Sequence, residues 1–483
     1  MQREKHNVVS HAAVYLLARG LPGVVAFFAI PVFSRLLEPA AYGRYALAIA
    51  SVNVAYALLL QWLRLSLVRY LAAPGREPTA VKSTLVTALV CIVGAAGVLA
   101  AAASLVPAWA PWRGMVAVCW ALLAVQSAFE LACEYARAAL RPWRYMRMQL
   151  LRAVAFVALG VVFVHAGAGW WGPAAGMGVG MAAAAALAWR RDWGDVRLKV
   201  DRGVLSALAQ YGVPLSVTVA LTVVINSSDR YLIAGMMGED AAGLYAVAAD
   251  FTAQTITLLM VSIHLAMFPV AVRAWEAGGA KAARQRMATN GSLLLAVGLP
   301  CVVGLTVLAP GIAHTFLGKS FRGAAAGIIP VVALGTFLAG VKNCHFDAAF
   351  QFAHRTISQV WIVLAAAVLN VGLNLAAIPK WGINGAAGAS VVAYVVAIGL
   401  TVWVGRRHVW LPIPAADVTR VALAAAGMGA ALWPWRDVVE PRAVAAQVVG
   451  GAVLYAALLV VTDFMGARGR VLGPRAVVAA EGL

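Results

Sequence analysis

Hydrophobic stretches follow one another along almost the whole chain and are separated by short polar loops. A transmembrane helix needs about 20 mostly apolar residues, and runs of that length, bounded by charge, proline or glycine, predict about 14 spans. The predicted spans are residues 11–35, 42–65, 83–106, 114–136, 149–166, 172–189, 210–236, 243–270, 291–313, 325–350, 357–378, 384–405, 418–434 and 443–463. The pattern indicates an all-α integral membrane protein.

The loops between the predicted spans alternate in charge. Every second loop is basic, and these loops contain most of the 38 Lys and Arg residues, among them Arg76, Arg141 and Arg191. Because cytoplasmic loops carry an excess of Lys and Arg, we expect this set on the cytoplasmic side, together with both termini. Arg64, at the end of the second span, and Arg69, just after it, are counted with the first of these loops.

Composition supports the membrane assignment and excludes other classes. The chain is 63% hydrophobic and 12% charged, with a mean hydropathy of +0.84, far from the balance of soluble domains. A net charge of +19 would favour nucleic-acid binding in a soluble protein, but topology explains the basic loops here. The five cysteines lie in apolar stretches without metal-like spacing, and no nucleophile–base arrangement is evident. We therefore expect no metal, cofactor, nucleic-acid partner or enzymatic activity.

The sequence also repeats itself weakly. One pair of similar strings places Gly43 on Gly243, and a second pair lies further along each half of the chain. The strings are EPAAYGRYALA (38–48) with EDAAGLYAVA (239–248), and WWGPAAG (170–176) with KWGINGAAG (380–388).

Two six-span halves with the same orientation in the membrane fit both pairs of strings. We expect an N-terminal lobe at residues 1–200 and a C-terminal lobe at residues 201–412. Residues 413–483 are expected to add two transmembrane helices and a short cytoplasmic tail. Two pseudo-symmetric lobes of this kind can enclose a cavity between them.

A small set of charged and amide side chains interrupts the spans. An ionised side chain near the bilayer centre costs on the order of 3 kcal/mol, so it tends to face protein or water and to have a partner. Four-residue steps place Glu130 and Glu134 on one helical stripe, and Asn343 and Asp347 on another. The candidate cavity residues are Arg19, Glu130, Glu134, Arg137, Asp229, Arg230, Asp250, Lys342, Asn343 and Asp347.

Some of these residues have a purely structural interpretation as well. Asp229 and Arg230 are adjacent and could form an ion pair at the outer headgroup level. The residues Glu130, Glu134 and Arg137 could instead form a salt-bridge network at a helix end. Arg19 differs, because it lies inside a long span with no acidic residue four positions away. We therefore expect Arg19 to face the cavity.

Four longer strings carry a family resemblance. They are FFAIPVFSRLLEPAAYGRYALA (27–48), SSDRYLIAGMMGEDAAGLYAVA (227–248), FLGKSFRGAAAGIIPVVALG (316–335) and LNVGLNLAAIPKWGINGAAGASVVAY (369–394). In this order they resemble the polysaccharide flippases of the multidrug/oligosaccharidyl-lipid/polysaccharide exporter superfamily. The resemblance implies a V-shaped pair of six-helix lobes around a central cavity, working by alternating access. It also implies translocation of undecaprenyl-diphosphate-linked oligosaccharide across the bacterial inner membrane for surface polysaccharide biosynthesis.

The implied substrate gives the charged residues a chemical role. Hydrocarbon excludes a lipid diphosphate strongly, and guanidinium groups can replace its lost hydration. Arg19 is the first candidate for phosphate binding, followed by Lys342 and Arg230. Asp250 stands where the resemblance implies a neutral residue, which fits either ion coupling or a local pair. Expected partners are the lipid-linked oligosaccharide, membrane lipids, a polysaccharide polymerase and glycosyltransferases.

Three other functions remain open at this point. A lipid-linked peptidoglycan precursor flippase would also have about fourteen spans and a cationic cavity. A cation-coupled multidrug exporter would need a cavity dominated by acids, whereas Arg19 and Lys342 are basic. A membrane-embedded glycosyltransferase or ligase would need a sizeable outer loop with catalytic acids, and the predicted outer loops are short.

Overall fold

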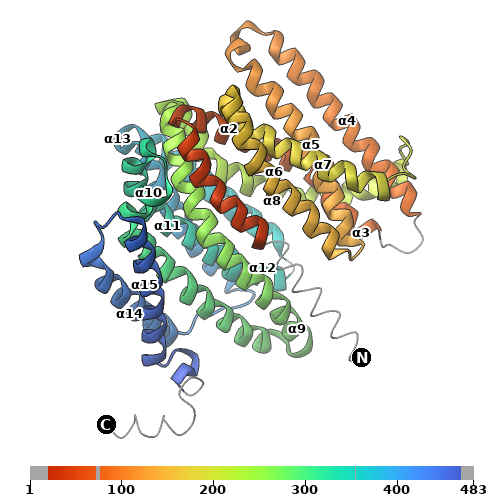
Figure 1. Ribbon diagram of the computed structural model, residues 1–483. Coiled ribbons are helices and arrows are strands. Elements are labelled where there is room, and N and C mark those ends of the chain that lie inside the picture. The colour runs from red at the N-terminus through yellow and green to blue at the C-terminus, as the bar shows by residue number, and fades with distance from the viewer. Residues whose placement is uncertain (1–19, 72–76, 354, 469–483) are drawn as a thin grey trace, which may run out of the picture. The chain divides into compact units, whose positions relative to one another are not determined.

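The computed structural model of the protein describes residues 20–71, 77–353 and 355–468 (Figure 1). All regular elements in these ranges are helices, which confirms the all-α prediction. Arg19, the first phosphate candidate, lies outside the described residues. Internal contacts divide the chain into two compact units, Met1–Gly243 and Leu244–Leu483.

The first unit is a bundle of helices. Its helix α8 packs against α2 and α3, although the sequence repeats place α8 in the second lobe. The repeats and the packing assign α8 to different halves of the chain, so the expected lobe boundaries stay a prediction. The helices are Gly20–Leu36, α2 (Pro39–Leu59), α3 (Gln61–Leu71), α4 (Pro78–Leu105), α5 (Arg113–Ala138), α6 (Pro142–Phe163), α7 (Gly172–Asp192) and α8 (Arg202–Met237), with short 3-10 helices at Pro107–Trp112 and Gly169–Trp171 and a π-helix at Val164–Ala168.

The second unit begins within a long helix and ends with a pair of helices. The final pair, α14 and α15, lies side by side (Figure 1). A π-helix, Lys342–Phe346, interrupts the helical run between α11 and α12. The helices are α9 (Glu239–Val307), α10 (Ala309–Phe316), α11 (Arg322–Val341), α12 (Ala348–Phe352), α13 (Thr356–Gly405), α14 (Ala415–Leu432) and α15 (Pro441–Val461), with 3-10 helices at Lys319–Phe321, Trp433–Trp435 and Phe464–Gly466.

Nine helical stretches of the described part are long and apolar enough to cross a membrane, or ten if the bent pair α2–α3 forms one span. α9 alone has 69 residues, which corresponds to about 100 Å of straight helix, against a hydrocarbon core of about 30 Å. Non-helical glycines divide such double-length stretches at Gly167, Gly279 and Gly382. The chain is thus a multi-pass membrane protein, and the count of about 14 spans stays a prediction.

The second predicted span is longer than expected. α2 and α3 meet at a bend of 49° and together run from Pro39 to Leu71, because no proline or glycine interrupts residues 44–71. Arg64 and Arg69 therefore lie on α3. Their assignment to a loop is wrong, whereas the cytoplasmic side of this end of the helix stays a prediction.

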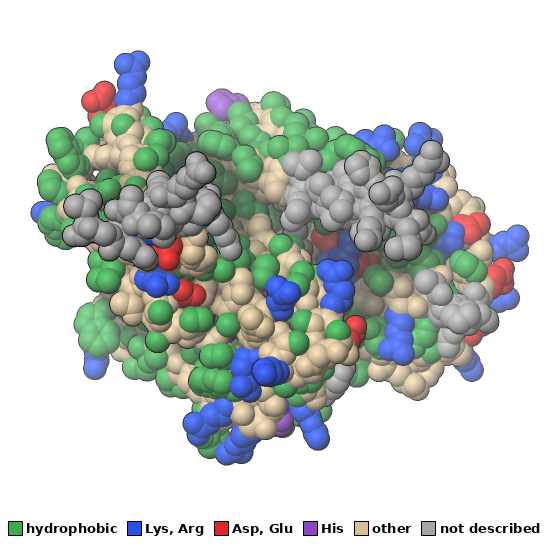
Figure 2. Space-filling model, turned by 90° about the horizontal axis from the view of Figure 1, so that it is seen from below, with side chains coloured by type: hydrophobic (Ala, Val, Ile, Leu, Met, Phe, Trp, Pro, Cys, Tyr) green, Lys and Arg blue, Asp and Glu red, His purple; other side chains and the backbone are tan. Residues whose placement is uncertain are grey.

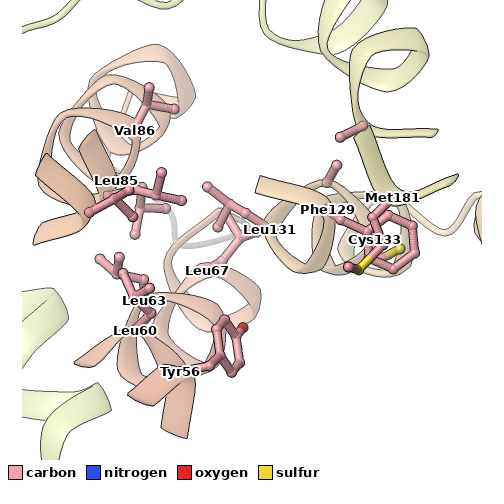
Figure 3. Packing of buried hydrophobic residues seen from close by; sticks show 14 of the residues in the cluster. Tyr56, Leu60, Leu63, Leu67, Leu85, Val86, Phe129, Leu131, Cys133 and Met181 are labelled. Atoms are coloured by element: carbon pink, nitrogen blue, oxygen red, sulfur yellow. The ribbon is translucent and has the colours of Figure 1, made fainter. Parts of the chain in front are cut away.

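The core of the first unit lies where α3, α4 and α5 meet. Leu60, Leu63 and Leu67 recur at three- and four-residue steps and so share one helical face. Figure 3 shows these leucines near Leu85 of α4 and Leu131 of α5. Lipid tails are as apolar as these side chains, so close packing, rather than removal from water, holds membrane helices together.

Hydrophobic side chains also cover much of the outside. Leu99 and Leu105 of α4 are 71% and 81% exposed. Figure 2 shows a face on which hydrophobic side chains are interspersed with Lys and Arg. Large exposed apolar areas are rare on soluble monomers, so this surface fits helices surrounded by lipid.

Candidate functional site

An ion pair joins α3 to α5 in the first unit. The Nη1 atom of Arg64 donates a hydrogen bond of 3.1 Å to Oε2 of Glu130. The side chains of Arg64 and Glu130 are 30% and 19% exposed, respectively. The Nε atom of Arg64 is buried and makes no hydrogen bond within the described part of the chain. The side chain of Arg64 thus stays partly accessible on a stretch that is long enough to cross a membrane.

Polar contacts continue along the same stripe of α5 on either side of Glu130. One turn before it, Gln126 donates to Oδ1 of Asn53 on α2, at 3.3 Å. One turn after it, Glu134 is buried and pairs with the half-exposed Arg137, at 3.3 Å. The Glu134–Arg137 pair fits the interpretation of a helix-end salt bridge, whereas Gln126 and Glu130 reach neighbouring helices.

Sequence reasoning missed two members of this cluster, Asn53 and Arg64. The two residues are eleven positions apart, which is about three helical turns, and both contact α5, one from each side of the bend between α2 and α3. The signal was the lack of a helix-breaking residue after position 65. Arg64 lies near the end of the predicted second span and is counted with the basic loop, so it does not enter the candidate set.

A second ion pair lies in the second unit and is almost fully enclosed. The Nζ atom of Lys342 donates to both carboxylate oxygens of Asp347, at 3.0 and 2.9 Å, and Nε2 of Gln359 on α13 donates to Oδ2, at 3.0 Å. Lys342 and Asp347 are each 3% exposed. All the charge of this pair is therefore compensated inside the protein.

The π-helix explains how residues five positions apart can pair. In an α-helix, positions i and i+5 point to different sides, but the wider turn of a π-helix joins them through a backbone hydrogen bond. Here the amide of Asp347 donates to the carbonyl oxygen of Lys342, at 3.0 Å. Asn343 is exposed on another side of the turn, so the predicted stripe of Asn343 with Asp347 is wrong.

The π-helix also presents a carbonyl group to side chains of α9. Nδ2 of Asn290 donates to the carbonyl oxygen of Cys344 at 2.9 Å, and Nδ1 of His264 lies 3.0 Å from the same oxygen. His345 is fully buried, with Nε2 at 3.3 Å from the carbonyl oxygen of Leu411. The two histidines thus contact backbone carbonyl groups around the turn.

The remaining candidates lie on other helices. Asp229 is buried and Arg230 is half-buried on α8, and Asp250 is half-buried on α9. The structure brings Glu130 and Glu134 into one cluster and Lys342 and Asp347 into another. A cavity shared by all the candidates stays a prediction. Among the described residues, no group of three His, Cys, Asp or Glu side chains could hold a metal ion.

A third ion pair fastens the segment after α7 to the start of α4. Nζ of the buried Lys82 donates to Oδ2 of Asp195 at 2.6 Å and to the carbonyl oxygen of Asp192 at 3.0 Å. The hydrogen bond from Lys82 holds the pKa of the Asp195 carboxyl below its ordinary value. The charged form of Asp195 therefore strengthens the attachment of this segment to α4.

Acidification is expected to release this segment. A folded-state pKa below the unfolded value of about 3.9 stabilises the contact fully above that value, and the contribution is lost as the pH falls through the folded pKa. Hydrogen-exchange protection of residues 193–201 should be constant from about pH 5 to 8 and fall in stronger acid. Asp195→Asn should lack this acid transition, and Asp240→Asn, at an exposed site, should keep it. Protection in Asp195→Asn that still falls in acid like the wild type would contradict the assignment.

The chain is similar to known proteins in sequence and in fold. A family described as polysaccharide biosynthesis protein matches residues 32–326. No curated protein sequence matches the chain.

Solved structures of transporters share the fold. The lipid II flippase MurJ, in an inward closed conformation, aligns with a TM-score of 0.79 at 11% identity, over 93% of this chain and 99% of that chain. An inward-facing multidrug resistance MATE family transporter of the MOP superfamily aligns with a TM-score of 0.64 at 16% identity, over 81% and 97%. The MATE multidrug transporter DinF-BH gives a TM-score of 0.58 at 15% identity, over 81% and 95%. The chain therefore has the fold of these transporters.

Proposed function

Because the chain belongs to the polysaccharide biosynthesis protein family, we propose that it moves an undecaprenyl-diphosphate-linked oligosaccharide from the cytoplasmic to the outer leaflet of the bacterial inner membrane. The family connects the chain with polysaccharide biosynthesis. The transporter fold supports movement of a substrate by alternating access, without a chemical change. In this proposal both termini lie in the cytoplasm, which the alternation of basic loops predicts.

The Arg64–Glu130 pair is the observation that best supports a phosphate-bearing substrate. A charged side chain inside a membrane tends to face protein or water, and 30% of the Arg64 side chain is exposed. A guanidinium has five N–H donors, of which the hydrogen bond to Glu130 takes one. The Nε–H is buried, so the remaining N–H groups of the two Nη atoms are the donors that can hold phosphate oxygens in a bidentate arrangement. Arg64 thus joins Arg19 and Arg230 as a proposed phosphate ligand.

Neighbouring polar groups suit the sugar part of such a substrate. Asn53 is exposed and lies beside Gln126, one turn from Glu130. Amide side chains both donate and accept hydrogen bonds, as sugar hydroxyls require. Lys342 is less suited to phosphate in this conformation, because Asp347 holds its ammonium group. Glu130 has a positioning role in this proposal, since it orients the guanidinium of Arg64.

Transport of a lipid-linked peptidoglycan precursor is the second candidate. The alignment with the lipid II flippase covers 93% of the chain, whereas the alignments with the two MATE transporters cover 81%. This observation favours a flippase over a cation-coupled exporter. It concerns the fold alone, so the two lipid-linked substrates must be separated by experiment.

Transfer of a fluorescent undecaprenyl-diphosphate oligosaccharide between leaflets, in vesicles containing only this protein, tests the proposal. We expect the wild type to make the labelled lipid accessible on the opposite leaflet. Arg64→Gln should slow transfer about tenfold, because a hydrogen bond to a charged group contributes about 1.5–3 kcal/mol. Arg64→Lys should recover part of the rate, since it restores the charge without the guanidinium fork.

Two controls separate the role of Arg64 from folding and from other functions. Arg273→Gln changes an exposed arginine of α9 and should transfer at the wild-type rate. Arg64→Gln/Glu130→Gln removes the unpaired carboxylate and should fold normally while remaining slow. If Arg64→Gln transfers the labelled lipid at the wild-type rate, Arg64 does not belong to the site. Preference for lipid II, or expulsion of a cationic dye without lipid transfer, would replace the proposed function itself.

A further inference from the structure

An apolar groove runs along α13, and its lining includes no residue of the two ion-pair clusters. Its volume is ≈ 380 Å³, within the range of about 300–1,000 Å³ that is typical of ligand pockets. Residues of both halves of α13, on either side of the turn at Gly382, contribute to it. The residues that define its shape are Ala377, Trp381, Asn384, Gly385, Gly388 and Val392.

Two glycines with opposite surroundings create the groove. A Cβ atom added to Gly385 would clash with the carbonyl oxygen of Ala377, so the two halves of α13 are in close contact there. A Cβ atom added to Gly388, about one turn further on, would meet no atom within 4 Å. The two halves are thus locked together near the turn, and an open trough begins directly after the contact.

The surroundings of the groove indicate a lipid chain as its occupant. α13 crosses the membrane, so the medium that meets an open apolar groove is hydrocarbon. The end of the groove beside the turn at Gly382 has an aromatic and a charged residue, because Trp381 is 67% exposed and the adjacent Lys380 is exposed as well. Tryptophan favours the membrane–water interface, and a lysine at that level attracts anionic headgroups. The alternation of loops places this turn on the outer side of the membrane.

We propose that the groove binds one acyl chain of an anionic phospholipid, with the phosphate at Lys380 and the amide of Asn384. The chain fills the trough beside Gly388 and Val392, and the indole of Trp381 covers its upper end. None of the residues that line the groove belongs to the two ion-pair clusters. The site is therefore a lipid-binding site separate from the substrate candidates, and it does not depend on the proposed function.

Native mass spectrometry of the full chain, released from vesicles of equal phosphatidylglycerol and phosphatidylcholine, tests the proposal. The wild type should retain one phosphatidylglycerol molecule. Gly388→Leu adds a side chain to the trough from a Cβ position with open space around it, and it should lower this retention about tenfold, equivalent to about 1.4 kcal/mol. Lys380→Gln should retain lipid but lose the preference for phosphatidylglycerol. Gly399→Leu is the matched control, because its added side chain also meets open space on α13 but lies outside the groove.

Three outcomes would overturn the inference. The first is a wild-type protein that retains no lipid, and the second is equal retention by Gly388→Leu and Gly399→Leu. The third is a lipid-free dimer that Gly388→Leu dissociates, which would make the groove an interface between two copies of the chain. If Gly388→Leu does not fold, Lys380→Gln tests the lipid site instead, because Lys380 is exposed. Unchanged retention of phosphatidylglycerol by Lys380→Gln would contradict the proposed headgroup contact.

Discussion

Replacing Asp347 with alanine is expected to lower the free energy of unfolding by about 3–5 kcal/mol. The substitution leaves the ammonium group of Lys342 without its counter-charge at a position that is only 3% exposed. It also leaves the Nε2 donor of Gln359 without its acceptor. Thermal unfolding of the purified protein in detergent, followed by its retention on size-exclusion chromatography, measures the effect.

A double substitution tests whether charge compensation is the cause. Replacing a buried ion pair with apolar residues of similar volume is often neutral or stabilising, whereas removing one partner is costly. Lys342→Met/Asp347→Leu should therefore recover most of the stability that Asp347→Ala loses. Equal melting of wild type and Asp347→Ala would show that the pair does not form in the folded protein.

The same double variant determines whether Lys342 has a direct role in transport. If the pair only stabilises the π-helical turn, the double variant should transfer labelled lipid at the wild-type rate. A loss of transfer in a stable double variant would instead show that the charge of Lys342 is needed, which would restore it as a phosphate candidate. The stability measurement and the transfer measurement thus separate a structural from a binding role.

Much of the fold could be predicted because hydrophobic runs and basic loops are properties of long segments. α4, predicted at 83–106, lies at Pro78–Leu105, and α5, predicted at 114–136, lies at Arg113–Ala138. The bilayer imposes these lengths on any helix that crosses it. Small errors in the periodicity do not matter at this scale.

The sites were harder to predict, because they depend on local departures from a regular α-helix. The pairing of Lys342 with Asp347 requires a π-helix, and four-residue steps place Asp347 with Asn343 instead. The pairing of Arg64 with Glu130 requires the helix to continue as α3 past the bend after α2, whereas the charge pattern counts Arg64 with a basic loop. A bend or a wide turn arises from the packing of neighbouring helices, which a single sequence does not display.

The repeated strings predict which positions of the two halves are equivalent. Their alignment places Gly43 on Gly243 as equivalent positions of two halves. In the structure these equivalent glycines also contact each other at the starts of α2 and α9, where a Cβ added to Gly43 would lie 3.0 Å from the amide nitrogen of Gly243. A Cβ added to Gly243 would lie 2.9 Å from the amide nitrogen of Gly43. The sequence predicts equivalence, and the reciprocal contact follows only from the fold.

This contact carries the second large prediction. Gly43→Ala is expected to lower the free energy of unfolding by about 3 kcal/mol, at the upper end of the usual cost of overpacking. The added methyl group would clash with the carbonyl oxygen of Glu239, which belongs to the backbone and cannot move aside as a side chain would. The starts of α2 and α9 would have to separate. Thermal unfolding in detergent and the folded fraction extracted from membranes measure the effect.

A glycine of α8 provides the matched control. A Cβ atom added to Gly235 would meet no atom within 4 Å. Gly235→Ala should therefore be neutral or stabilise the helix by up to about 1 kcal/mol. Gly43→Ala with wild-type stability would mean that the two backbones are not in close contact.

The double variant Gly43→Ala/Gly243→Ala tests whether the two glycines share one contact. Gly243→Ala should be as costly as Gly43→Ala, because its methyl group would clash with the carbonyl oxygen of Pro39 in the same way. Once one methyl group has separated the two backbones, the second enters space that is already open. The double variant should therefore lose clearly less stability than the sum of the single losses, since residues that share a contact are not additive. Simple addition would mean that the two glycines act at separate contacts.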